Sequence, residues 1–177
     1  VIVTGSPLAE VLSHYRAKWE SSPVLETCGL DAGGYYLVSF HREENVDSAP
    51  QLRRFVEILN RLVGEYSKKI VLTAHPRTRM RLAALAEKID EQVSFYKPFS
   101  FTDYVKLQVS AKAVLSDSGS ITEESSILNF PALNLREATE RSEGMEEGSV
   151  IMSGLSWARI HESLSVLESQ PRGDQRL

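Results

Sequence analysis

Short apolar runs alternate with longer amphipathic stretches along this chain. Residues 35–40 read YYLVSF, and residues 49–66 then place apolar side chains at helical spacing, beginning with Leu52, Phe55 and Val56. The same change of period recurs every 20 to 35 residues or so, as in a series of βα units. This alternation predicts an α/β fold, a Rossmann-like parallel sheet with helices on both faces.

The boundaries of the expected elements follow from the same pattern. Strands are expected at residues 35–40, 69–74, 93–96, 112–115, 132–135 and 150–152. Helices are expected at residues 7–19, 49–66, 78–89, 101–109 and from 121 onward. With neither an internal repeat nor a low-complexity segment to divide the chain, we predict one Rossmann-like domain over residues 1–177.

Polar side chains follow the expected strands. His41 and Arg42 come after the first strand, His75 and Arg77 after the second, and Lys97 after the third. The turn 117–120 follows the fourth strand, and a cluster beginning at Arg136 follows the fifth. Since ligands of parallel α/β sheets bind at the carboxyl ends of the strands, these groups are expected to converge on one site.

The turn Asp117-Ser118-Gly119-Ser120 has the composition of a phosphate site. It leads into a helix whose first N–H groups have no partner within the helix, and such an end attracts an anion. Ser118 and Ser120 can add hydroxyl donors, while Gly119 allows close approach of the backbone. An ordinary N-cap is the alternative interpretation of the turn taken alone.

Composition narrows the classes of function. The chain of 177 residues is 42% hydrophobic and 25% charged, which suits a soluble domain with a sizeable core, and its net charge of −4 gives no reason to bind nucleic acid or an anionic membrane. The single cysteine, Cys28, excludes an internal disulfide. No apolar run reaches the length of a membrane span, so the cytoplasm is the expected compartment.

Four motifs together resemble a known family. They are HREEN at 41–45, HPRT at 75–78, DSGSITEES at 117–125 and REATERSEG at 136–144. In order and spacing they are similar to the C-terminal domain of the non-hydrolysing UDP-N-acetylglucosamine 2-epimerases. The sequence around HREENVDS most resembles the branch of that family acting on UDP-N-acetyl-fucosamine-type sugars. The resemblance implies the C-terminal half of a GT-B-like pair of Rossmann-type domains, with the N-terminal domain absent from this chain.

The resemblance also implies roles for individual residues. Ser118, Gly119 and Ser120 match the family's diphosphate site, and Arg141 matches an arginine that contacts the diphosphate, with Arg136 supporting its loop. Glu124 matches the acceptor for the ribose hydroxyls, a role that suits a carboxylate facing a diol.

Further residues match the base and sugar positions. Tyr104 stands where an aromatic residue packs against uracil, and Phe99 is expected near the edge of the base. His41 matches a histidine beside the diphosphate and sugar and is the candidate catalytic residue, since an imidazole could stabilise charge on departing UDP. Arg42 is either a second ligand contact or a surface ion-pair partner. His75 and Arg77 either line the cleft or tie the loop down.

The implied reaction inverts C2 of a UDP-2-acetamido sugar by elimination and re-addition of UDP, in the synthesis of surface-polysaccharide precursors. It requires no cofactor, and the scattered carboxylates and histidines do not indicate a metal. The resemblance places the acid/base carboxylates in the N-terminal domain, so this chain alone is expected to be inactive while retaining weak UDP affinity. The full-length protein is expected to be a homodimer, and this chain by itself a monomer.

The sequence departs from the family pattern at three positions. Ser120 stands where a second glycine is common, Thr122 where glutamine is common, and Ser142 where proline is found. A serine at 120 is tolerable if its backbone angles are ordinary, although its Cβ could narrow the site. Serine in place of proline loosens the loop carrying Arg141.

Two other functions fit the same pattern. A GT-B glycosyltransferase domain would use the same phosphate and ribose groups but transfer the sugar to an acceptor. A non-catalytic UDP-sugar sensor would bind the ligand without exchanging the C2 proton. The pairing of HREEN with TERSEG favours the epimerase over the glycosyltransferase.

Overall fold

The computed structural model describes residues 7–136 and 150–173. Its centre is a six-stranded sheet in the order β3-β2-β1-β4-β5-β6, in which every neighbouring pair is parallel. The strands are β1 (Tyr35–Ser39), β2 (Lys69–Thr73), β3 (Val93–Tyr96), β4 (Ala113–Ser116), β5 (Ala132–Asn134) and β6 (Val150–Met152). All six expected strands are confirmed, with ends that differ from the predicted ones by a single residue at most.

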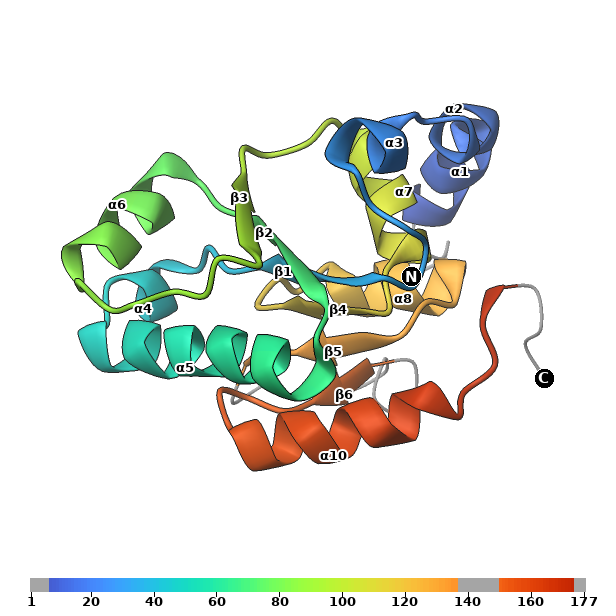
Figure 1. Cartoon of the computed structure of the whole chain (residues 1–177). Coiled ribbons are helices and arrows are strands. Elements are labelled where there is room, and N and C mark those ends of the chain that lie inside the picture. Colours follow the sequence, from blue (N-terminus) through green and yellow to red (C-terminus); the bar gives the residue numbers. More distant parts are fainter. Residues whose placement is uncertain (1–6, 137–149, 174–177) are drawn as a thin grey trace, which may run out of the picture.

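Helices cover both faces of the sheet (Figure 1). The face bearing Tyr36 and Val38 packs on α5 (Ala49–Tyr66), α6 (Pro76–Ala84) and α10 (Trp157–Glu168). The face bearing Tyr35 and Leu37 packs on α3 (Val24–Cys28), α7 (Phe101–Ser110) and α8 (Ile121–Leu128). Successive residues of β1 thus enter opposite cores, as the pleat of a strand requires. The predicted α/β class, a parallel sheet between helical layers, is confirmed.

The helix expected at residues 7–19 is interrupted. The structure has α1 (Pro7–His14) and α2 (Arg16–Glu20), joined at Tyr15. The backbone carbonyl of Leu12, which would accept from residue 16 in a continuous helix, accepts instead from the indole Nε1 of Trp19 at 3.1 Å. That side-chain bond ties α2 to α1, and the local periodicity gives no sign of it.

The helix expected at residues 78–89 is also displaced. It begins at Pro76, because the Nδ1 of His75 accepts from the backbone N–H of Arg77 and proline is favoured in a first helical turn. It ends at Ala84, shortly before Ala86, whose positive φ of 54° lies outside the helical region. The short helices α3 and α4 (Glu43–Val46) fall in segments that the sequence pattern assigned to loops.

Candidate functional site

A cavity of about 580 Å³ opens at the carboxyl edge of the sheet. Its lining includes residues that follow β1, β2, β3 and β4: His41, His75, Arg77, Pro98, Phe99, Ser118 and Ser120. Residues of α7 and α8, Tyr104 and Glu124, complete this part of the wall. The predicted convergence of strand ends therefore occurs, and it occurs where β1 and β4 are neighbours and the strand order reverses direction.

The turn after β4 leaves the start of α8 uncapped by its own side chain. Ser120 has ordinary right-handed angles, φ −69° and ψ −21°, and makes no side-chain capping bond. Its hydroxyl instead lies 2.9 Å from that of Ser118. Ser120, the serine that replaces the family's glycine, is therefore unstrained. Its side chain does not occupy the first-turn N–H groups of α8, which attract an anion.

Arg136 lies beside this turn. A Cβ placed on Gly119 would be 3.8 Å from Nη1 of Arg136, so the guanidinium approaches the backbone of the glycine. The cavity lining within the described residues does not include Gly119, Arg136 or Arg42. Arg141 and Ser142, which the sequence placed in the same region, lie outside the described residues.

Glu124 lines the cavity from the first turn of α8, and Gln108 holds it. The Nε2 of Gln108, a buried residue of α7, donates a short hydrogen bond to Oε2 of Glu124. This bond restricts the carboxylate to one orientation. Gln108 is not predictable from the sequence, since a single glutamine in an amphipathic helix gives no signal that its amide faces a carboxylate.

Tyr104 is partly buried and borders the cavity. Burial, and next the charge of Glu124, raise the pKa of its hydroxyl, which a hydrogen bond with Ser39 partly opposes. Its ring packs against the core under α7, near Phe99. The aromatic residues predicted to meet uracil thus both line the cavity, with Tyr104 forming part of its floor.

The loop after β1 is held by a carboxylate from the end of β4. Asp117 is fully buried and accepts from the backbone N–H groups of His41 and Arg42 and from the side-chain amide of Asn45. About half of the His41 side chain is exposed, at 48%, and it borders the cavity. Asp117 was predicted only as part of the turn, because its burial depends on the pairing of β1 with β4.

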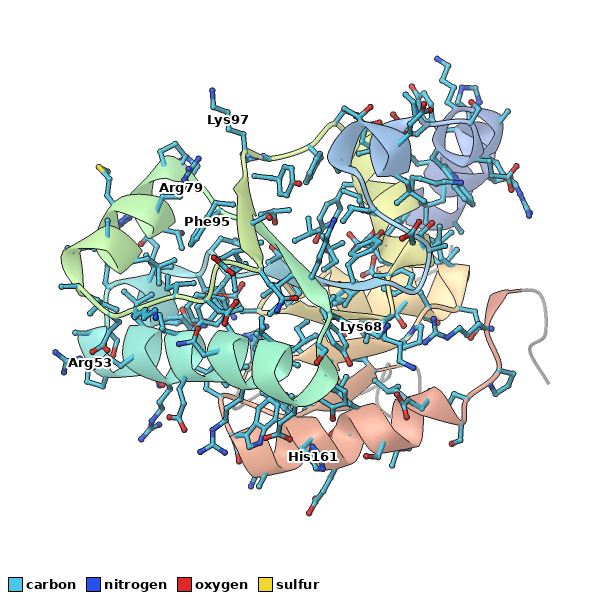
Figure 2. The ribbon with its side chains drawn as sticks, in the orientation of Figure 1. Arg53, Lys68, Arg79, Phe95, Lys97 and His161 are labelled. Atoms are coloured by element: carbon cyan, nitrogen blue, oxygen red, sulfur yellow. The ribbon has the colours of Figure 1, made fainter. Side chains whose placement is uncertain are left out.

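The other cationic residues near the strand ends differ in their partners and in whether they line the cavity. Arg77 pairs with Glu43 and Asp47 across the cavity mouth, which ties α4 to α6, and Arg42 pairs with Glu44 through Nε. Figure 2 shows Lys97 pointing away from the sheet and Arg79 reaching over Phe95, 5.7 Å from the ring centre. Of the cationic residues that follow β2 and β3, His75 and Arg77 line the cavity, and Lys97 does not belong to its described lining.

The described residues contain neither a cluster of metal ligands nor a membrane-spanning helix. Within residues 7–136 and 150–173, no three His, Cys, Asp or Glu side chains are grouped as metal ligands would be. In the same part of the chain, no helix has the length and apolar character needed to cross a membrane.

The fold and the site define a Rossmann-type ligand-binding unit with an anion-attracting helix start at its switch point. The family follows from sequence comparison. The sequence model described as UDP-N-acetylglucosamine 2-epimerase matches residues 1–176, so the chain belongs to this family, and the predicted resemblance is confirmed.

Individual relatives agree. The UDP-N-acetylglucosamine 2-epimerase of Methanocaldococcus jannaschii is 32% identical over 142 residues, which cover 78% of this chain and 39% of that protein. The Rickettsia bellii enzyme structure superposes with a TM-score of 0.84 at 39% identity, covering 97% of this chain and 46% of the other. An M. jannaschii structure in complex with UDP-GlcNAc and UDP gives a TM-score of 0.87 at 27% identity, covering 97% and 49%. This chain therefore spans less than half the length of these relatives.

Proposed function

We propose that this chain is the UDP-binding part of a 2-epimerase acting on UDP-2-acetamido sugars for surface-polysaccharide precursors. The observation that carries the proposal is the cavity between the ends of β1 and β4, which combines the start of α8, Glu124 and His41. Family membership supports an epimerase in preference to a glycosyltransferase or a UDP-sugar sensor. The M. jannaschii complex with UDP-GlcNAc and UDP supports the class of ligand.

The diphosphate is assigned to Ser118, Gly119, Ser120 and the start of α8. There, the hydroxyls of Ser118 and Ser120 lie at a helix N-terminus, and the guanidinium of Arg136 lies close by. Arg141 is assigned to the same phosphates on the family resemblance. Arg42 remains a candidate contact to UDP through its guanidinium, although its Nε is engaged by Glu44.

The nucleoside is assigned to the other wall of the cavity. Glu124, held through Oε2 by Gln108, is placed to accept hydrogen bonds from the ribose diol. Phe99 and Tyr104 offer an aromatic surface to the uracil. No cofactor is assigned.

The chemistry proposed for the whole protein breaks the C1–O bond of the sugar and removes the proton from C2. The C–H electrons form a C1=C2 double bond, and UDP leaves with the electrons of the C–O bond. Return of UDP to C1, with a proton added to the other face of C2, gives the epimer. His41 is the residue proposed to stabilise the departing UDP, while the groups that move the C2 proton are not assigned to this chain.

A calorimetric titration with UDP tests the proposal. We expect weak binding by the chain, with affinity lowered about tenfold or more in Glu124→Gln, the loss typical of hydrogen bonds to a charged group. Glu123→Gln, one position away on α8 and outside the cavity lining, is the matched control. With 2′-deoxy-UDP, the difference between wild type and Glu124→Gln should shrink. Equal UDP affinity for wild type and Glu124→Gln contradicts the ribose assignment.

The wider setting is part of the same proposal. A cytoplasmic location is proposed on the strength of family membership. That residues 1–177 form one domain remains a prediction. That the whole protein is a homodimer and this chain a monomer are also predictions, which sedimentation of both forms would test.

A further inference from the structure

Asp117 contacts the loop after β1 at several points. Its Oδ2 accepts from the backbone N–H of Arg42 at 2.9 Å, from the Asn45 Nδ2 at 3.1 Å and from the His41 N–H at 3.2 Å. Its Oδ1 accepts from the same His41 N–H at 3.1 Å. A fully buried carboxylate needs this number of donors to remain charged, and here the donors come from a segment more than 70 positions earlier in the chain.

The same Oδ1 also faces the imidazole of His41. Nδ1 of the ring lies 3.3 Å from Oδ1 and 3.3 Å from the hydroxyl of Ser39. A negative charge at this distance favours a proton on Nδ1. The Ser39 hydroxyl can accept a hydrogen bond from Nδ1 in the same arrangement.

We propose that Asp117 is a positioning residue for His41, holding the imidazole proton on Nδ1 and leaving Nε2 as the nitrogen that faces the ligand. The consequence for chemistry rests on the proposed function, in which His41 meets the diphosphate of UDP. With its backbone N–H bonded to Asp117 and its Nδ1 3.3 Å from the same carboxylate, the histidine has Nε2 as its remaining ring nitrogen.

The variant Asp117→Asn distinguishes an effect on the His41 tautomer from the anchoring of the loop after β1. Its single oxygen can replace Oδ2, which receives most of the loop's hydrogen bonds, so its NH₂ group would occupy the place of Oδ1. That NH₂ group can only donate, and it would face Nδ1. The loop would stay anchored while the preferred tautomer of His41 changes to Nε2–H.

The test is the ¹⁵N spectrum of the His41 ring in the whole 177-residue chain. It is recorded about two pH units above the ordinary histidine pKa of about 6.5, where a neutral ring shows its tautomer. His41→Gln assigns the signal among the four histidines. We expect Nδ1–H in wild type and a shift of the tautomer ratio of about tenfold or more toward Nε2–H in Asp117→Asn. Nε2–H in wild type, or an unchanged ratio in folded Asp117→Asn, would overturn the proposal.

Two further variants keep the result interpretable. Asp90→Asn removes a carboxylate that also accepts a backbone N–H, from Gln92 at 2.9 Å, but lies before β3 at the opposite edge of the sheet, and it should leave His41 unchanged. If circular dichroism shows that Asp117→Asn is unfolded, Ser39→Ala decides. Retention of Nδ1–H without the Ser39 hydroxyl supports Asp117, and a change to Nε2–H refutes it.

The proposed function fails independently of this inference. A chain with His41 in the Nδ1–H form that shows no affinity for UDP counts against the proposed function alone. A chain that binds UDP with His41 in the Nε2–H form overturns the present inference alone.

Discussion

Tyr35 and Tyr36 are adjacent on β1 and both fully buried, yet only the hydroxyl of Tyr35 has a hydrogen-bond partner among the described residues. The Tyr35 hydroxyl donates to the backbone carbonyl of Leu107 at 2.7 Å, whereas that of Tyr36 has no hydrogen-bond partner within residues 7–136 and 150–173. Because consecutive residues of a strand point to opposite faces, Tyr35 and Tyr36 pack against different helical layers of the fold.

This difference predicts opposite outcomes for two matched substitutions. Tyr35→Phe leaves the Leu107 carbonyl without its partner and should lower the free energy of unfolding by about 1 to 2 kcal/mol. Tyr36→Phe removes a buried unpaired hydroxyl and should leave stability unchanged or raise it slightly. Urea unfolding at neutral pH measures both. Equal losses in the two variants would show that the Tyr36 hydroxyl does have a partner.

Alkaline pH should destabilise the chain through its buried tyrosines. Burial raises the pKa of Tyr104 above its ordinary value of 10, so the unfolded chain loses this proton first as pH rises. The contribution to stability is therefore complete below about pH 10 and decreases above it, by at most about 1.4 kcal/mol per pH unit for each such tyrosine. Urea midpoints between pH 8 and pH 11 or so measure this slope, and Tyr104→Phe should reduce it. An identical slope in the variant would contradict the prediction.

Gln108 should matter for ligand affinity although it is not among the lining residues of the cavity. Gln108→Leu removes the donor that orients Glu124, and we expect UDP affinity to fall about three- to tenfold, which corresponds to the loss of one ordinary hydrogen bond. Gln51→Leu is the control, because Oε1 is buried and unpaired in both glutamines and Gln51 belongs to α5. A UDP affinity unchanged by Gln108→Leu would mean that Glu124 keeps its orientation without the hydrogen bond from Gln108.

Arg77 should act as a tie between α4 and α6. Its terminal nitrogens are engaged by Glu43 and Asp47, and all three side chains are substantially exposed, so Arg77→Met should cost no more than about 1 kcal/mol of stability and less in high salt. UDP affinity should change less than about threefold. Arg81→Met, which breaks a second ion pair to Asp47, is the comparison. A tenfold loss of UDP affinity in Arg77→Met alone would instead place this arginine on the ligand.

Much of the fold could be predicted because its signals are local. A run such as residues 70–72 is apolar and fully buried, and α5 has apolar residues at regular helical spacing. The errors have local causes of another kind. The side chain of Trp19 competes for a helical carbonyl, and the ring of His75 begins a helix earlier than periodicity indicates.

The site was predictable to the extent that its residues directly follow strands. His41, Ser118 and Ser120 could be found because polar residues after buried strands gather at one edge of a parallel sheet. Gln108 and the role of Asp117 could not, since both lie in segments whose partners are set by packing.

The sequence by itself determined the succession of strands and helices, the chemistry offered at each strand end and membership of the epimerase family, because periodicity and motifs are properties of neighbouring residues. Only the tertiary structure decided which of these groups meet. Asp117 reaches the His41 loop because β1 pairs with β4 on one edge as well as with β2 on the other, and such pairing is fixed by the packing of the whole sheet between its two helical layers.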